Sequence, residues 1–575
     1  MIVNNRPAFL TQSHQLKTLY RKPDGYLENP DVIVIGSGLG GLAFASTMAQ
    51  KREAKVLVLE AGPVPGGATS VFEDGGFEFN KGLHSVSEMD AALTPYSVYA
   101  YTADYVTAGR VKWAQMPDVH EVTVMKGGWT HEWHSTPEQN IAALSARYPQ
   151  HAAGIARYYE LEKRISMRGA GWAMTKLLPD WVPEWARDAA FAAVGAPWKK
   201  YLSRTTTDVL TKELGLSHEL ATLFSYMYGN YGRTPERAPF TLHAAVMFHY
   251  RYGAQYPVGG PGQIANAIVP IIEAAGGQVA VSSGVKEIMV EGNRAVGVRL
   301  HDGTEIRSKV IVSGASAYET FMRLLPREVS ARHGYTKLFE HLGMSPAHVY
   351  LFAGYDQHLE LPKHIVWQLP DYEGIDGHDL AAADAQFKQH LRFKGGMAYV
   401  ISPSARDPLW RQRYPNKSTV IVLAEAGPGW AERVKTDEGF RRELEEKTRE
   451  SFLEVAQRHF PALRGKTPAY VKVGTPVGCN VNAKDGASYG LEASPERFSR
   501  FTHLLRPQTK IEGLYLTGQD PASPGIAGAM FSARFTYAAV TGDLFHTLSR
   551  EPSPLKGQLP AVTQTASSGD FDKAA

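Results

Sequence analysis

The stretch "DVIVIGSGLGGLAFASTMAQKREAKVLVLE", residues 31–60, predicts a strand, a glycine turn, a helix and a second strand. Its first apolar run, residues 32–35, is typical of a parallel strand buried on both faces. Gly36, Gly38 and Gly41 follow with the spacing G-x-G-x-x-G. The first glycine permits a tight turn, the second lets the backbone approach a pyrophosphate, and the third lets helix and strand pack closely. The unit therefore predicts a dinucleotide-binding site.

The helix after this turn, at about residues 39–51, extends the predicted site. Leu39 and Gly40 stand in its first turn, where backbone N–H groups point at bound phosphates. The strand "KVLVLE" ends at Glu60, 24 residues after Gly36. A carboxylate at this distance accepts hydrogen bonds from both ribose hydroxyls and repels a 2′-phosphate. The alternative is a glycine-rich loop that binds no ligand.

A second glycine turn follows in "EAGPVPGGATSV", residues 60–71. Gly66 and Gly67, which lie between Ala61 and Ala68, form another turn where the backbone can approach a ligand closely. An NAD-binding domain does not need such a turn. The sequence "LEAGPVPGG" after such a unit resembles the FAD-binding half of the amine oxidase and phytoene desaturase superfamily. The resemblance implies that FAD is the cofactor and that these four residues contact it.

The end of the chain holds a second strand–glycine–helix unit, "LYLTGQDPASPGIAGA", at residues 514–529. In the superfamily that the chain resembles, the last strand and helix return to the same FAD. The resemblance implies that Asp520 faces the ribityl or pyrophosphate region, and that the backbone of Val285 contacts the adenine. The remaining contacts that it implies are Gly518, Gly525, Ile526 and Ala527.

Several further segments narrow the resemblance to the retinol saturase and carotenoid isomerase branch. They include "GLHSV" at 82–86, "MYGNYGRTPERAPFTLHAAVMFHYRYGAQYPVGG" at 227–260 and "ISPSARDPLWRQRYPNKSTVIV" at 401–422. In the same order as in that branch, they cover most of residues 30–550. The resemblance implies an FAD-dependent oxidoreductase that acts on carbon–carbon double bonds of a long apolar polyene, retinoid or carotenoid-like, with a saturase or reductase as the leading interpretation.

Two alternatives stay open. Within enzymes, the chain is a flavin-dependent cis–trans isomerase or desaturase of carotenoids or polyunsaturated fatty acids. From another class, it is a non-catalytic prenyl-lipid binding protein of the same fold. The sequence holds no second dinucleotide unit for NAD(P)H, so a reductase needs an external electron donor.

The predicted fold class is α/β, with a Rossmann-like FAD-binding domain interleaved with an α+β substrate-binding domain. The FAD-binding parts are predicted at 30–110, 255–330 and 505–550, the substrate-binding parts at 111–254 and 331–504, and tails at 1–29 and 551–575, the last disordered.

Composition excludes several function classes. The net charge of +3 is too small for a general nucleic-acid binder, and no nucleic-acid motif is present. The single cysteine, Cys479, excludes an intramolecular disulfide framework and a cysteine-ligated iron–sulfur cluster within one chain. No run of 18 apolar residues predicts a spanning helix, and the N-terminus predicts no secretory signal.

One region has the composition of an interfacial helix. Trp172, Trp181, Trp185 and Trp198 are four of the ten tryptophans, and residues 161–204 carry eight Lys or Arg against four Asp or Glu. Tryptophan with flanking lysine is typical of helices that lie in a membrane surface. We therefore expect peripheral membrane association, on the cytoplasmic side. The alternative is a helical hairpin that covers the substrate cavity with its apolar face.

Reduction of a polyene also needs a proton donor. Tyr250 and His249 precede the "YPVGG" segment, and His84 follows a strand predicted to end beside the flavin; we expect one of these three to donate the proton. Each is equally well explained as a structural residue of the cavity wall. "HEVTVMKGGWTHEWH", residues 120–134, gathers three histidines but reads as a hairpin, and we predict no metal site.

Overall fold

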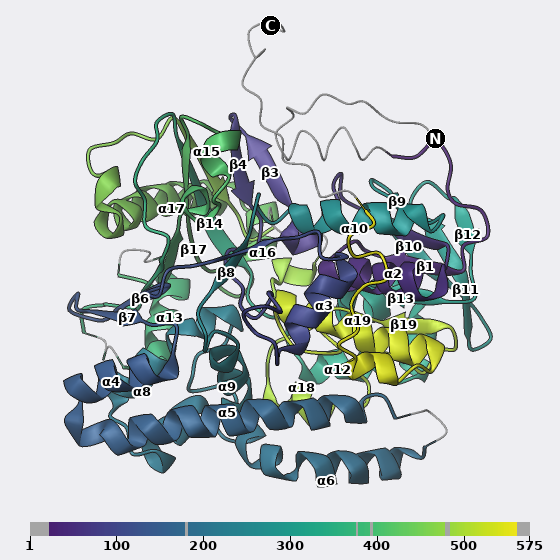
Figure 1. The fold of residues 1–575 in the computed structure, drawn as a ribbon, viewed down its shortest axis with the longest axis horizontal. Helices are drawn as coiled ribbons and strands as arrows, with labels where there is room; N and C mark the ends of the chain where they lie inside the picture. The colour runs from purple at the N-terminus through teal and green to yellow at the C-terminus, as the bar shows by residue number, and fades with distance from the viewer. Residues whose placement is uncertain are drawn as a thin grey trace, which may run out of the picture.

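The computed structural model describes residues 22–178, 182–374, 376, 378–391, 395–477 and 483–559 (Figure 1). Two large sheets lie side by side, a parallel one built around the first glycine turn and a mixed one formed mainly by later segments of the chain. Helices α5 (Ala152–Thr175) and α6 (Glu184–Leu202) run along one edge of the molecule. Alternating α and β elements with a parallel sheet confirm the predicted α/β class.

The five-stranded sheet has the order β19-β13-β1-β2-β9, with every neighbouring pair parallel. Its strands are β1 (Val32–Ile35), β2 (Val56–Leu59), β9 (Gln278–Ala280), β13 (Ile311–Ser313) and β19 (Leu514–Leu516). Alternate residues of β1 enter two different hydrophobic cores, because the sheet is covered on both faces. This double burial accounts for the uninterrupted apolar run of the sequence.

Helices α2 (Leu39–Arg52), α10 (Gln263–Ala274) and α19 (Ile526–Thr541) belong to this half of the molecule (Figure 1). A small antiparallel sheet of β10 (Val285–Glu291), β11 (Arg294–Leu300) and β12 (Glu305–Arg307) adjoins it. Its two hairpin turns lie at residues 292–293 and 301–304.

The seven-stranded sheet has the order β18-β14-β17-β16-β15-β6-β7. Its strands are β6 (Glu121–Val124), β7 (Thr130–Trp133), β14 (His348–Tyr355), β15 (Ile365–Gln368), β16 (Ala398–Ile401), β17 (Ser418–Glu425) and β18 (Tyr470–Gly474). Only the β15–β6 pair is parallel, and it joins segments about 245 residues apart. One face packs against the long helix α17 (Glu438–His459). The other face carries an aromatic core that faces the cofactor-binding half.

The remaining strands and helices connect these layers. They are β3 (Val71–Asp74), β4 (Phe77–Asn80), β5 (Trp113–Gln115), β8 (Gln255–Pro257), α3 (Val98–Val106), α4 (Pro137–Arg147), α7 (Thr206–Asp208), α8 (His218–Phe224), α9 (Phe240–His249), α11 (Arg327–Arg332), α12 (Tyr335–His341), α13 (Leu380–His390), α14 (Pro403–Arg406), α15 (Trp410–Arg413), α16 (Trp430–Thr436) and α18 (Pro495–Phe498).

All strands of the five-stranded sheet come from the ranges that we predicted for FAD binding, and all strands of the seven-stranded sheet come from the other ranges. The described ends of the chain are attached to the body. Leu27 N donates to Gln278 Oε1 over 2.8 Å, and Lys556 forms a 2.8 Å ion pair with Asp104. The predicted disorder of the C-terminal tail therefore does not hold for residues 551–559, because apolar Leu555 and Leu559 also pack against the body.

Candidate active site

Two glycine turns meet at the carboxyl end of the parallel sheet. Gly66 N donates to Ser37 O over 3.1 Å, and Gly38 and Gly66 form a β-bridge. A Cβ atom on Gly67 would lie 3.0 Å from the Gly38 Cα, whereas a Cβ on Gly38 would meet nothing within 4 Å. Gly38 thus faces open space next to the N-terminus of α2, which is where a pyrophosphate needs close access to backbone N–H groups.

Glu60 closes one side of this turn. Its Oε2 accepts hydrogen bonds from the Ser37 backbone N–H (2.9 Å) and the Ser37 hydroxyl (2.6 Å), and its Oε1 accepts one from Gly62 N (2.7 Å). Ser283 N donates to the Glu60 carbonyl over 2.7 Å, which brings the start of β10 with Val285 to the same edge. A Cβ on Gly284 would lie 3.4 Å from the Ala61 Cβ. The carboxylate is therefore fixed where a ribose would follow the pyrophosphate.

The end of the chain returns to the same place. A Cβ on Gly40 would lie only 2.7 Å from the Cα of Gly518, so the first turn of α2 touches the turn after β19. Gly525, with φ of 90°, is the residue before α19, and a Cβ there would meet nothing within 4 Å. Ile526 and Ala527 form the first turn of α19. Two helix N-termini from opposite ends of the chain therefore open toward one region.

Asp520 has a structural role in this region. Its Oδ2 accepts a hydrogen bond from Ala317 N (2.7 Å), its Oδ1 accepts one from Leu491 N (2.9 Å), and Arg497 lies 3.7 Å from Oδ1. The buried carboxylate thus ties three segments together. Its contact with the cofactor stays a prediction.

These features fit an elongated dinucleotide: two turns without side chains, two helix N-termini and one fixed carboxylate. The family model described as "Flavin containing amine oxidoreductase" matches residues 39–540. The chain belongs to this family. It is an FAD-dependent oxidoreductase, and the predictions of cofactor and enzyme class are confirmed.

Relatives that are 30–31% identical confirm the predicted retinol saturase and carotenoid isomerase branch. The all-trans-retinol 13,14-reductase of Danio rerio is 31% identical over 526 residues, covering 88% of this chain and 85% of that protein. The chloroplastic prolycopene isomerase of Daucus carota is 30% identical over 314 residues, covering 52% and 48%. Cyclohexylamine oxidase from Brevibacterium oxydans has a similar fold, with a TM-score of 0.57 at 16% identity over 90% of this chain and 100% of that one.

His84 lies next to the cofactor turns. The residue before it, Leu83, donates a backbone hydrogen bond to Ala68 O over 3.1 Å. The side chain of His84 is buried, and within the described ranges neither ring nitrogen has a hydrogen-bond partner. Burial, with smaller contributions from His348 and Arg406, lowers the pKa of His84 to about 3. The imidazole is therefore neutral and presents two unsatisfied polar atoms to the space between the two halves.

Tyr250 and His249, at the end of α9, both contact the segment that follows His84. The Tyr250 hydroxyl donates to Ser85 O over 3.1 Å, and burial raises its pKa well above the usual value. His249 Nε2 accepts a hydrogen bond from Ser87 N (3.1 Å), and its Nδ1 lies 3.4 Å from a Glu88 carboxylate oxygen. Both ring nitrogens of His249 are thus engaged in holding this segment.

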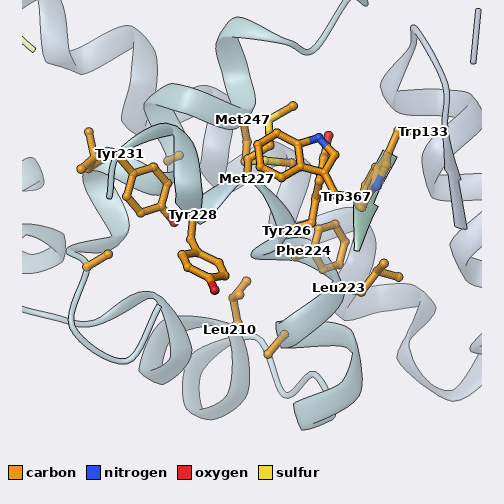
Figure 2. Close-up of a cluster of buried hydrophobic side chains, with 14 of the residues drawn as sticks. Trp133, Leu210, Leu223, Phe224, Tyr226, Met227, Tyr228, Tyr231, Met247 and Trp367 are labelled. Carbon is orange, nitrogen blue, oxygen red and sulfur yellow. The ribbon is translucent and has the colours of Figure 1, made fainter. Parts of the chain in front are cut away.

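The seven-stranded sheet supplies the opposite wall. A row of paired residues crosses it in the order Tyr350, Leu423, Tyr399, Trp367 and Thr123. The ring centroids of Tyr399 and His84 are 5.9 Å apart, so this row faces the cofactor turns. Figure 2 shows Trp367 with Trp133, Tyr226 and the methionines of the adjoining core cluster. A flat aromatic surface of this kind suits a long conjugated ligand.

A pocket opens at the edge of this core. Trp133, Tyr226, Met247 and Tyr250 form its apolar side, and the ion pair of Glu162 and Arg251 (2.5 Å) forms its polar side. Burial raises the pKa of the Glu162 carboxyl to about 8, although Arg251 opposes the shift. The cavity volume of about 20 Å³ is enough for roughly one water molecule.

Sequence reasoning missed Glu121 and Arg406, both buried between the two halves. Glu121 lies in β6 and accepts a hydrogen bond from the Trp367 indole N–H. Arg406 donates to Lys363 O (2.7 Å) and to the Ser85 hydroxyl (3.2 Å). Arg406 lies in the segment 401–422 that carries the resemblance, but nothing in that segment singles out its side chain. The only local signal for Glu121 was a single carboxylate at the start of the apolar strand "EVTV".

The three clustered histidines lie in the predicted hairpin of β6 and β7. His134 Nδ1 pairs with Asp118 Oδ2 over 2.7 Å, and His131 packs edge-on against Trp133. Within the described ranges, no three His, Cys, Asp or Glu side chains are placed to hold a metal ion. Cys479 lies outside those ranges.

Proposed function

We propose that this enzyme reduces a carbon–carbon double bond of a long apolar polyene of the retinoid or carotenoid class. The observation that carries the proposal is the aromatic sheet face opposite the cofactor turns, with Tyr399 5.9 Å from His84. The resemblance to a retinol 13,14-reductase over 88% of the chain supports the same reaction class. The relative's substrate is proposed for this chain at the level of class only.

The proposed site divides the work between the two halves. When bound and reduced, FAD supplies a hydride equivalent. Gly36, Gly38 and Gly41 with Glu60 would hold the nucleotide end, and the backbone N–H groups of the first turn of α19 would bind the flavin end. Tyr350, Tyr399 and Trp367 orient the conjugated chain and exclude water. Tight aromatic packing fixes which double bond lies at the reacting position.

A proton must accompany the hydride, and the three sequence-derived candidates differ in their fitness to donate it. His84 is neutral because burial lowers its pKa to about 3, and both ring nitrogens of His249 are occupied. Tyr250 keeps its proton at neutral pH. Tyr250 is therefore the best donor among these three motif residues, although burial also makes its hydroxyl a weak acid. Its test is the rate of anaerobic flavin reoxidation in Tyr250→Phe beside His249→Gln and His84→Gln.

We also propose that α5 and α6 dock on a membrane, from which an apolar substrate can enter directly. Three apolar side chains of this hairpin are exposed to solvent, Trp185 (74%), Met167 (64%) and Val194 (48%), and Lys199 and Lys200 lie exposed at the end of α6. Trp198 does not contribute, because it is buried and its indole N–H donates to Ile165 O over 3.0 Å. Trp181 and the side chain of Trp172 lie outside the described residues.

No helix in the described ranges is both long and apolar enough to cross a bilayer. Docking would therefore occur through the surface of the α5–α6 hairpin. An external reductant, a small molecule or a redox protein, must supply electrons for repeated turnover.

The decisive experiment is anaerobic incubation of dithionite-reduced holoenzyme with retinol, a carotene and a polyunsaturated fatty acid, followed by mass spectrometry. A gain of two hydrogens in a polyene supports the proposal. An unchanged mass with altered geometry identifies an isomerase, and loss of two hydrogens with oxidised enzyme identifies a desaturase. Binding without any product from either redox state would identify a lipid-binding protein and overturn the proposal.

A further inference from the structure

We propose that the carboxyl group of Glu121 is the acid that protonates the polyene in this reaction. The inference rests on the reductase function proposed above and names a residue outside every motif of the sequence. It is carried by the position of Glu121 on the sheet face, by its unsatisfied oxygen and by the buried cation near it.

Glu121 lies on the inner, aromatic face of the seven-stranded sheet. It is paired with Ile365 on β15 and with Trp133 on β7, and only 1% of its surface is exposed. Its Oε2 accepts the hydrogen bond from the Trp367 indole, whereas its Oε1 has no hydrogen-bond partner among the described residues.

The contacts of Glu121 connect it with the reacting end of the site. The ring of Trp367, which binds Glu121, is 4.6 Å from that of Tyr399, and Tyr399 is 5.9 Å from His84. His84 in turn follows Leu83, which is hydrogen-bonded to the cofactor turn at Ala68. Glu121 is thus on the sheet side of the space, and the cofactor turns form the other side. These rings pack against one another, so a polyene bound here would have to part them, with Glu121 on one side and the cofactor turns on the other.

The protonation state of Glu121 suits this role. Burial raises the pKa of its carboxyl to about 8, although the Trp367 hydrogen bond and Arg406 favour the charged form. Around it are Arg406, Tyr226, Tyr250 and Tyr399, and burial raises the pKa of each tyrosine. At neutral pH the tyrosines and Glu121 are neutral, so Glu121 is the strongest acid of the group. A donor whose pKa is near the working pH is also the most effective one.

Arg406 explains how the site tolerates the loss of that proton. Its side chain is 1% exposed, and no carboxylate in the described ranges lies within ion-pair distance of it. The resting site therefore carries a positive charge that no neighbouring negative charge compensates. Burying a cation in this way is costly. Deprotonation of Glu121 creates the missing negative charge nearby. Arg406 therefore stabilises the carboxylate that proton transfer leaves behind, although burial keeps Glu121 protonated in the resting site.

The step balances in atoms and electrons. One carbon of the double bond accepts a hydride from two-electron-reduced FAD, and the π bond breaks. The adjacent carbon takes the proton of Glu121 and forms the second new C–H bond. The polyene is reduced by two electrons, FAD is left oxidised, and Glu121 is left as a carboxylate that regains a proton from solvent.

The test uses single-turnover reoxidation of dithionite-reduced, FAD-loaded enzyme by retinol in micelles, across pH 6–10. Glu121→Gln should slow the step at least about 100-fold with unchanged flavin content, and Glu121→Asp should recover part of the rate. In wild type the rate should fall tenfold per pH unit above about pH 8, because the carboxyl is then ionised. Glu121→Gln should lack this decline.

A second readout does not depend on activity. The infrared spectrum of oxidised holoenzyme should contain a C=O band of a neutral carboxylic acid that disappears above about pH 8. In Glu121→Gln this band should lose the part that Glu121 contributes, whereas the part that arises from Glu162, whose pKa is also about 8, should remain. The contribution of Glu121 should persist in the control Glu273→Gln, which removes another carboxyl of raised pKa, in α10 of the cofactor-binding half.

The outcomes separate the two proposals. If wild type reduces none of the tested polyenes, the proposed function fails. If wild type is active and Glu121→Gln keeps its rate within a few-fold with the same pH dependence, the role of Glu121 is overturned. If Glu121→Gln does not fold, Glu121→Asp decides. An aspartate carboxyl at this position should have a different pKa, so the pH at which the rate declines should shift. An unshifted decline refutes the proposal.

Discussion

The two halves of this enzyme build their sites from different materials. In the cofactor-binding half the site consists of backbone, because Gly38, Gly40 and Gly525 keep it free of side chains. In the substrate-binding half the site consists of side chains, aromatic residues on a sheet face with Glu121 among them. In the backbone site an added side chain either collides with the protein, as at Gly40, or enters space left for the cofactor, as at Gly38. The side-chain site responds in proportion to the group removed. Substitutions in the two halves should therefore fail in different ways.

The largest effect is expected at Gly41. A Cβ atom there would collide with the carbonyl oxygen of Gly36, so a side chain forces α2 away from β1. Gly41→Val should yield no cooperatively folded protein, measured by soluble yield and thermal melting. The matched control is Gly38→Ala, whose added methyl group meets no protein atom within 4 Å. A normally folded Gly41→Val protein would contradict the close packing of helix and strand.

Gly38→Val is expected to separate folding from cofactor binding. Because the position faces open space, the fold should survive, but the side chain occupies the region proposed for the pyrophosphate. The purified variant should melt as a folded protein and contain little or no FAD by absorbance. Normal flavin content in this variant would show that the nucleotide binds elsewhere.

In the substrate-binding half, Arg251→Met should destabilise without blocking folding. It leaves the buried Glu162 carboxyl without its partner, which costs about 3–5 kcal/mol. The folded state then holds a proton that the unfolded chain releases, so stability should fall as pH rises from about 5 to 8. Chemical denaturation at several pH values measures this. The double variant Arg251→Met/Glu162→Leu should recover much of the loss; no recovery would argue against an isolated pair.

The smallest effect is expected at the surface of α6. Trp185→Ser should weaken liposome binding by about tenfold, equivalent to ~1.4 kcal/mol, and leave the melting temperature unchanged. Phe545→Ser is the control, because Phe545 is 93% exposed but lies on another element. An equal loss in both variants would mean that membrane contact is not specific to the α5–α6 hairpin.

The same division determines what the sequence can predict. A backbone site leaves a local signature, and residues 32–41 and 66–67 specify their turn without reference to the rest of the chain. Glu121 acquires its surroundings only when β6 pairs with β15. Its neighbour Trp367 is 246 residues away, and nothing local records that pairing. Trp198 was misassigned for the same reason, since composition does not say which face of a helix is covered.

The contact between Gly40 and Gly518 also fixes an order of events during synthesis. A ribosome adding about 5–20 residues per second needs roughly 25–100 s to advance from one turn to the other. Throughout this interval the nascent chain has β1 and its glycine turn. It still lacks β19, the edge strand beside β13, and the N-terminus of α19. FAD can therefore be captured fully only after the turn at Gly518 and the start of α19 have been made. Cofactor retention is in this way a late check on synthesis, and products truncated before Gly518 should be colourless.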